Sequence, residues 1–178
     1  IPLNERKRLG ALLDDRPQAE VMAMIPQFSQ AETDNFVAPP AQIPEALGVL
    51  MFNMERGVNL PEIQEFLRDC PDIQPFDVIL ANELDDGCAR SGNKNTAREL
   101  AQAFGLNYAW GLEFIELVND ENAKGFHGNA VFSRWPIRRA GVIRLPEQYN
   151  WYFDRQKRIG GRLAVFAELD VGGQPVGA

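Results

Sequence analysis

The sequence predicts an α+β fold in which helices cover a mixed β-sheet. Two short apolar runs, at 48–54 and 76–82, are each followed by a segment with helical spacing, which gives the order strand, helix, strand, helix. After residue 106 the chain becomes rich in segments that are typical of antiparallel strands. The 178 residues suit one domain or part of a larger one, and no apolar run approaches the ~20 residues of a membrane span.

The first strand and helix are predicted between residues 48 and 70. The run "GVLMFNM" is short, apolar and bounded by Gly48 and a charged pair, as in a buried strand. In the following "NLPEIQEFLRDC", Pro61 suits the first turn of a helix. The apolar residues of this segment recur at helical spacing, at Leu60, Ile63, Phe66 and Leu67.

The second strand ends in a group of acidic residues. "FDVILAN" (76–82) is again a short apolar run, and it leads directly into "ELDDG". A helix is then predicted in "NTARELAQAFG", where Thr96 and Glu99 fit a capping box and Gly105 is placed to end the helix. We interpret the apolar run as a buried strand that delivers a carboxylate to the edge of the sheet.

The rest of the chain is predicted to form antiparallel strands. "NYAWGLEFIELV" is consistent with one long strand or with two paired ones. "GNAVFS" (128–133) and "AGVIRL" (140–145) are expected strands, and "GRLAVFAELDV" (161–171) ends at a Gly-Gly turn. "QPVGA" then starts a further strand, so we expect the sequence to stop within the fold.

Residues 1–45 are predicted to be an N-terminal helical and proline-rich extension, which leaves 46–178 as the main domain. Apolar residues near the start have helical spacing in places. Prolines interrupt this pattern repeatedly, at Pro17, Pro26, Pro39, Pro40 and Pro44.

The net charge of −7 is unevenly distributed. Residues 1–123 carry 9 Lys and Arg against 21 Asp and Glu, which gives −12, whereas residues 124–178 carry 9 against 4, which gives +5. The acidic first part argues against broad non-specific nucleic-acid binding. The basic second part suits either a phosphate-binding surface or an ordinary solvated one. Cys70 and Cys88 are too few for a disulfide framework and lack zinc spacing, so reduced thiols are expected.

Polar side chains stand at the ends of both buried strands. The first strand ends at Asn53 and the second at Asn82 and Glu83. If the strands are parallel neighbours, Asn53 and Glu83 emerge at the same edge of the sheet, where ligands bind in α/β architectures. A carboxylate with a neutral oxygen donor suits Mg²⁺, or Mn²⁺ in its place. The alternative is that Asn82, Glu83, Asp85 and Asp86 form an acidic turn.

Three further residues are candidates for binding substrate. His127, the single histidine, lies in "GFHGNAVFSR" and suits either a catalytic site or a loop or core position. Asn129 is placed to donate to a phosphate oxygen or to serve a tight turn, and Arg56 follows the end of the first strand. No phosphate-binding P-loop is present, because "GCARSGNKN" lacks the required spacing.

The order of these motifs resembles that of the endonuclease/exonuclease/phosphatase superfamily, which includes deoxyribonuclease-type nucleases, apurinic endonucleases, neutral sphingomyelinases and inositol polyphosphate 5-phosphatases. "VLMFNMERG" resembles the first strand of that family, and "FDVILANELDDG" resembles its "PDVIxLQE" strand. "GFHGNAVFSRWPI" is similar to "GxxGNAILSRYPI", which is the most specific match. "GGRLAVFAELDVGGQPV" resembles the strand pair that precedes the family's "NTHL", and the likeness covers about residues 46–178.

The resemblance implies a fold, a reaction and residue roles. The fold would be the first half of a four-layer α/β sandwich with a mixed sheet covered by helices. The reaction would be metal-dependent hydrolysis of a phosphodiester or phosphomonoester, with water attacking in line. Glu83 matches the family's metal-binding glutamate, Asn53 the asparagine beside metal or phosphate, and Asn129 the asparagine of the "GNA" segment. The familiar glutamine before the glutamate is Asn82 here.

The second half of the family's site has no counterpart in this sequence. The catalytic histidine of "THL", the "GDFN" pair and the closing "SDH" belong to later segments, and His127 stands in the wrong motif to replace that histidine. We therefore expect the N-terminal half of a Mg-dependent, nuclease-like hydrolase that is inactive without its partner, the C-terminal half of the same protein.

Two other interpretations stay open. One is a non-catalytic binding module on the same fold, and the other is an unrelated α+β protein. The substrate is undecided among nucleic acid, phospholipid head group, inositol phosphate and small phosphodiester. Trp110, Trp135, Trp151 and Tyr152 are candidates for stacking on a substrate, although core positions are commoner for such residues. No signal peptide is visible, so the cytoplasm is favoured, while processing of the N-terminus stays open.

Overall fold

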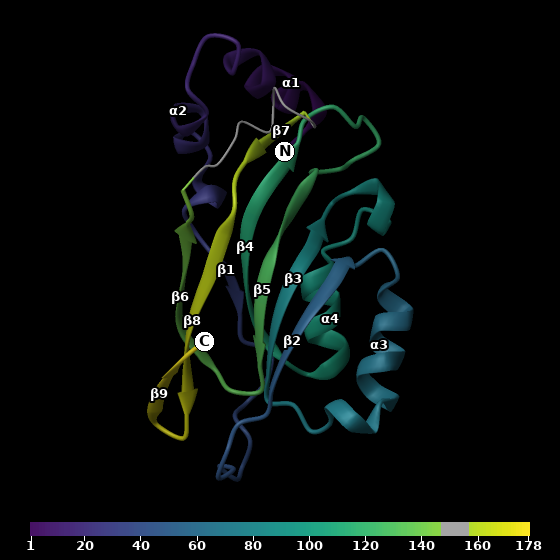
Figure 1. The fold of residues 1–178 in the computed structure, drawn as a ribbon, viewed down its shortest axis with the longest axis vertical. Helices are drawn as coiled ribbons and strands as arrows, with labels where there is room; N and C mark the ends of the chain where they lie inside the picture. Colours follow the sequence, from purple (N-terminus) through teal and green to yellow (C-terminus); the bar gives the residue numbers. More distant parts are fainter. Residues whose placement is uncertain (147–156) are drawn as a thin grey trace.

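Two β-sheets lie against each other in the computed structural model, which describes residues 1–146 and 157–178 (Figure 1). The described strands of the larger sheet have the order β1-β4-β5-β3-β2, with β7 pairing to β4. The smaller sheet has the order β6-β8-β9. The strands are β1 (Glu32–Asp34), β2 (Val49–Arg56), β3 (Val78–Asp86), β4 (Asn107–Glu116), β5 (Phe126–Ser133), β6 (Ile137–Arg144), β7 (Arg158–Gly160), β8 (Leu163–Val171) and β9 (Gln174–Gly177).

Helices cover one face of the larger sheet. In Figure 1, α4 lies behind β2 and β3 and α3 lies to their right, whereas α1 and α2 lie at the upper end of the molecule. Short 3-10 turns connect these elements within the described residues. The helices and turns are α1 (Leu3–Leu12), α2 (Gln18–Ala23), η1 (Pro26–Phe28), α3 (Leu60–Asp69), η2 (Pro71–Ile73), η3 (Ala89–Ser91) and α4 (Thr96–Phe104).

The predicted order of strand, helix, strand, helix is confirmed in the first part of the chain. β2 and β3 are parallel neighbours, in a register that places Asn53 opposite Asn82, and α3 connects them. β4 is one strand of ten residues that pairs antiparallel with β5, which decides between the two alternatives for this segment. The α+β class and the mixed sheet are therefore confirmed.

The two faces of the larger sheet pack against different layers. On the helix side, Leu84 and Leu100 are fully buried in the main core. On the other side, Val131 and Leu169 belong to a second core between the two sheets. Burying a large aliphatic side chain contributes about 2 kcal/mol, so both layers hold the sheet in place.

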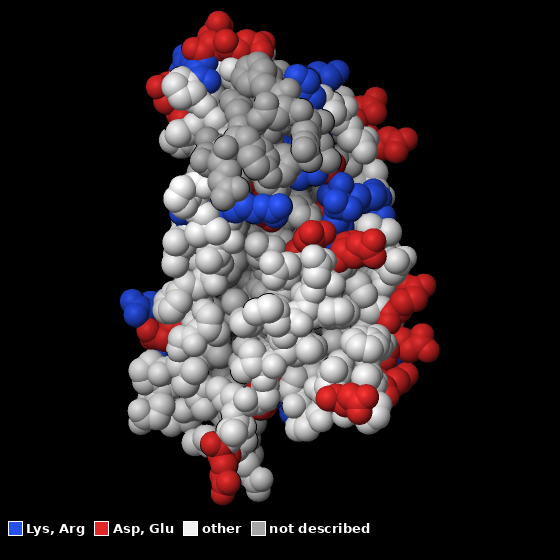
Figure 2. Space-filling view, in the orientation of Figure 1, with Lys and Arg blue, Asp and Glu red and all other residues white. Residues whose placement is uncertain are grey.

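Part of the second face remains uncovered within the described chain. Val49 and Met51 of the edge strand β2 are 59% and 75% exposed, while the alternating Leu50 and Phe52 pack toward the helices. Figure 2 shows blue and red side chains gathered near the carboxyl ends of β2 and β3, above a largely uncharged area in the middle of this face. The sheet thus presents a charged end and an apolar surface next to it.

The N-terminal segment packs onto the sheet in the described structure. Leu9, Val21 and Phe28 are buried in the main core, and β1 pairs antiparallel with β4. The expected helices are present, and the prolines separate short elements rather than excluding structure. The boundary at residue 45 between an extension and a main domain stays a prediction.

The described structure also bears on the expectations for membrane spans, for the cysteines and for the aromatic side chains. No helix in residues 1–146 or 157–178 is long and apolar enough to cross a membrane. Cys70 and Cys88 are free thiols, and burial raises the pKa of the Cys88 thiol above its usual value. Trp110 and Trp135 are buried, with 4% and 1% exposure, so neither is an exposed stacking surface. Trp151 and Tyr152 lie outside the described residues.

Arg6 anchors helix α1, and its replacement should destabilise the fold. The buried guanidinium donates to the backbone oxygens of Glu116, Asn119 and Asn122 at 3.0, 2.8 and 2.7 Å. We expect Arg6→Met to lower the free energy of unfolding by about 3 kcal/mol, because the stem is kept while buried carbonyls lose a charged donor. Chemical denaturation measures this change.

Arg8→Met is the matched control for this substitution. Arg8 lies on the same helix but is exposed and pairs with Glu5. Surface ion pairs contribute little, so this variant should unfold at nearly the wild-type denaturant concentration. Equal effects of the two substitutions would show that Arg6 does not anchor the segment.

Candidate active site

The carboxyl ends of β2 and β3 have an unusual backbone. Glu55, Arg56 and Glu83 have φ values of 46°, 67° and 60°, which lie in the left-handed region. Non-glycine residues adopt this region rarely, and they concentrate at functional sites when they do. The two predicted ligands, Asn53 and Glu83, stand within this stretch of neighbouring parallel strands.

A β-bulge sets the direction of the Glu83 side chain. Ala81 pairs with Ala130 and Leu84 with Gly128, so Asn82 and Glu83 together stand opposite the single residue Asn129. A bulge of this kind interrupts the ladder and re-aims a side chain, which is common beside active sites. The Asn129 side chain compensates for the interruption, because its Oδ1 accepts the backbone N–H of Glu83 at 3.1 Å.

The Glu83 carboxylate is half-buried and without a partner among the described residues. No hydrogen bond or ion pair from residues 1–146 or 157–178 reaches its oxygens, although its backbone N–H is bonded. Asn53 is exposed, and its Oδ1 accepts the Glu55 N–H at 2.9 Å. A carboxylate that loses part of its hydration without gaining a donor is destabilised unless a ligand supplies a positive charge.

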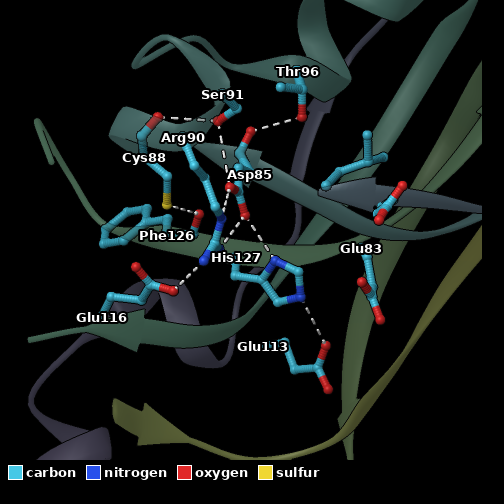
Figure 3. Close-up of polar contacts among 12 residues, drawn as sticks. Glu83, Asp85, Cys88, Arg90, Ser91, Thr96, Glu113, Glu116, Phe126 and His127 are labelled. Atoms are coloured by element: carbon cyan, nitrogen blue, oxygen red, sulfur yellow. Dashed lines mark hydrogen bonds and ion pairs between the residues drawn. The ribbon is translucent and has the colours of Figure 1, made fainter. Parts of the chain in front are cut away.

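A buried ionic network lies next to Glu83 (Figure 3). Asp85 is 0% exposed, and its carboxylate accepts hydrogen bonds from Arg90 Nε and Nη2 at 2.6 and 2.9 Å. His127 Nδ1 contacts the same carboxylate at 2.8 Å, and His127 Nε2 lies 3.9 Å from Glu113. Arg90 also reaches Glu116 at 2.6 Å. The network therefore ties β3, β4, β5 and η3 together.

Charge pairing, rather than burial, determines the protonation of this network. Burial opposes the ionised form of Asp85, but hydrogen bonds from His127 and Arg90 hold its pKa below the usual value. Burial likewise opposes the charge on Arg90, yet Asp85 and Glu116 raise its pKa. By contrast, burial raises the pKa of Asp86 despite its ion pair with Lys124.

The structure places the expected substrate-binding residues at different depths. Asn129 contacts the backbone of Glu83, and Arg56 lies at the end of β2 opposite Leu84. His127 is buried, with 6% exposure, and both of its ring nitrogens face carboxylates. This environment favours a structural role for His127, and its contact with substrate stays a prediction.

The network itself was not predicted from the sequence. Glu113 lies in the predicted strand segment "NYAWGLEFIELV", and the structure leaves it 1% exposed and paired with Arg162 at 2.8 Å. Asp85 and His127 are 42 residues apart in the sequence, and only the register of β3 with β5 brings them together. The available signals were the acidic end of the strand predicted at 76–82 and the single histidine directly before the strand predicted at 128–133.

The donor set fits a hard divalent cation only in part. Asn53 and Glu83 offer an amide oxygen and a free carboxylate at one edge, which suits Mg²⁺ with several retained waters. Among the described residues no group of three or more His, Cys, Asp or Glu side chains is arranged to hold a metal ion. A complete all-protein cage is therefore not formed by this part of the chain.

The arrangement of sheets and helices is part of the fold of endonuclease/exonuclease/phosphatase proteins. An endonuclease/exonuclease/phosphatase from Beutenbergia cavernae has a similar structure, with a TM-score of 0.50 and 20% sequence identity. The similarity covers 71% of this chain and 35% of that chain, so the present sequence spans about a third of the other protein's length. No family model and no curated protein matches the sequence.

Asp85→Asn should test the buried network through its dependence on pH. We expect a loss of about 3 kcal/mol in the free energy of unfolding at pH 7, because the Arg90 charge loses its buried partner. The pKa of Asp85 is lowered in the folded state, so its contribution is present above about pH 4 and is lost as the pH falls through the folded-state pKa. Denaturation of both proteins from pH 7 to pH 2 should show the difference narrowing.

Asp34→Asn provides the control for an exposed pair. Asp34 contacts Arg98 at 3.2 Å, and the side chains of Arg98 and Asp34 are 44% and 37% exposed, in contrast to the fully buried Asp85. This variant should change stability little at any pH. A loss for Asp85→Asn that stayed constant down to pH 2 would contradict the role given to the ionised carboxylate.

Proposed function

We propose that this chain is the N-terminal part of a metal-dependent phosphoesterase. The observation that carries the proposal is the half-buried Glu83 carboxylate, which has no described partner and is held on a left-handed bulge by Asn129. Maintaining such a residue costs about 1–3 kcal/mol in backbone strain, which a purely structural position would not require. The partial similarity in fold to an endonuclease/exonuclease/phosphatase supports the same reaction class.

The residues of this chain would orient a cation and a phosphoryl group. Glu83 and Asn53 would hold Mg²⁺ or Mn²⁺, which supplies charge stabilisation to phosphoryl oxygens. Asn129 fixes the Glu83 backbone through its Oδ1 and keeps its amide N–H groups for a nearby acceptor. The Asp85–Arg90–His127 network restrains the strands from which these groups project.

Further chain would have to complete the site. The described residues supply the Glu83 carboxylate at the edge, and none of them is assigned as the base that would activate water. The apolar surface around Val49 and Met51 lies beside this edge and suits contact with an additional layer. We therefore infer that catalysis requires a C-terminal half that covers this surface and contributes the remaining groups.

A binding module on the same fold is the second candidate. The limited donor set favours it, because no cluster of three metal-binding side chains forms within the described ranges. Both candidate functions predict cation binding, but only the phosphoesterase predicts hydrolysis of a phosphoester. A longer form of the protein that binds Mn²⁺ through Glu83 but hydrolyses no phosphoester would support the binding module.

Glu83→Gln should weaken cation binding without unfolding the protein. Mn²⁺ titrations of the 178-residue chain, followed by NMR line broadening near Asn53 and Glu83, should show affinity falling by roughly tenfold or more, because ligand charge tunes such sites. The matched control is Glu62→Gln, since Glu62 is exposed on α3. Wild-type Mn²⁺ affinity in Glu83→Gln would exclude Glu83 as the ligand.

The 178-residue chain alone should show no hydrolysis, because one carboxylate and one amide cannot also supply the base and the remaining charge stabilisation. The purified chain should hydrolyse phosphodiesters and phosphomonoesters no faster with Mg²⁺ or Mn²⁺ than with a chelator. A separately produced C-terminal half should restore activity if the two halves dock, and Glu83→Gln should abolish the restored turnover. Metal-dependent hydrolysis by the chain alone would overturn the requirement for further residues.

A further inference from the structure

A cationic pocket opens next to the carboxyl ends of β2 and β3. It has a volume of about 530 Å³, within the range of small-molecule sites. The pocket lies close to the candidate active site, because Arg56, which lines the pocket, pairs with Leu84, the neighbour of Glu83. The pocket is lined by Arg56, Arg90, Glu116, Val118, Asn119, Lys157 and Arg158.

Positive charges dominate the pocket. Four of the lining side chains are cationic, and the single carboxylate, Glu116, is already paired with Arg90 and with the Asn122 amide. Burial lowers the pKa of Arg158; Glu116 and Glu113 oppose this shift, while the charges of Arg90 and Arg56 add to it. The positive charges of Arg56 and Arg90 would attract an anion that enters the pocket.

Arg90 is fixed before any ligand arrives, whereas Arg56 is restrained only at its backbone. Arg90 is held by three contacts with Asp85 and Glu116 at 2.6–2.9 Å, which leave further guanidinium N–H groups available. Arg56 is held by a left-handed backbone, and its side chain has no hydrogen bond or ion pair within the described ranges. A fixed guanidinium binds phosphate in a bidentate fashion with little loss of side-chain entropy.

We propose that this pocket binds a second phosphate group of the substrate, separate from the phosphoryl group at Glu83. The inference rests on the proposed function and narrows the substrate to phosphoesters with at least two phosphates. Figure 2 shows the corresponding juxtaposition, with blue side chains directly beside red ones near the carboxyl ends of the two strands. The chemistry is shared by an inositol polyphosphate and by a nucleic-acid strand.

Anion binding to the 178-residue chain, measured in chelator by calorimetry, tests the proposal without metal or hydrolysis. The probes are inositol hexakisphosphate and a short single-stranded oligonucleotide. At least one should bind, and Arg56→Gln should weaken that binding by roughly tenfold, the effect of losing a charge-assisted hydrogen bond. The probe with the tighter, Arg56-dependent binding identifies the source of the second phosphate.

Three variants separate this pocket from other effects. Arg139→Gln removes a positive charge from the exposed face of β6 and should bind the probes like wild type. Arg56→Lys keeps the positive charge but not the planar guanidinium, so it should bind the probes more weakly than wild type. This variant replaces Arg56→Gln in the test if Arg56→Gln does not fold. Glu83→Gln should lose Mn²⁺ affinity while keeping probe binding, which distinguishes failure of the metal site from failure of the pocket.

The proposal has a clear contrary result. Absence of binding by both probes, or equal affinities of wild type and the folded Arg56 variants, would overturn it. Equal weakening by Arg139→Gln and Arg56→Gln would do the same, because it would indicate a general charge effect.

Discussion

The buried carboxylate of Asp85 is the group on which the arrangement at the carboxyl ends of β2 and β3 depends. An ionised carboxylate with no exposed surface would cost several kcal/mol if its partners were absent, so Arg90 and His127 must stay in contact with it. These partners come from η3 and β5, and Arg90 extends the link to Glu116 at the end of β4. One desolvated charge thus fixes the relative positions of the segments that surround Glu83, two residues earlier on β3.

This rigidity explains how a strained glutamate can persist at the end of a strand. The bulge at Asn82 and Glu83 removes a ladder hydrogen bond, and left-handed φ adds strain that a flexible strand end would release. Asn129 holds the bulge on one side through the Glu83 N–H, and the network around Asp85 holds it on the other. The carboxylate is therefore presented in a defined direction before any ligand binds, which is the condition for effective electrostatic stabilisation.

Sequence reasoning succeeded where local pattern determines structure. The apolar runs of β2 and β3 and the Gly105 end of α4 carry their own signals, and strand ends alone placed Asn53 and Glu83 at one edge. The predicted capping box of α4 was wrong, because Asn95 rather than Thr96 caps the helix and the Thr96 hydroxyl donates to the backbone oxygen of Asp85. The short strands β1 and β7 have three residues each, too few for a sequence pattern, and they form because they pair with β4. Burial of Arg6 depends on carbonyls more than 100 residues away, and the Asp85–His127 contact depends on strand register. Such long-range determinants leave no periodic trace in the sequence.

For the phosphoesterase proposed above, the charge distribution adds a constraint on the kind of substrate. The first 123 residues carry a net charge of −12, so the wider surface repels a long polyanion. The cations of the pocket at Arg56 and Arg90 act over a short range, since charges separated by more than about 10 Å are largely screened at physiological salt. A compact or flexible phosphoester enters the attractive region while little of it lies over the acidic surface. An extended duplex would interact with both, so the balance of charges favours the smaller ligand.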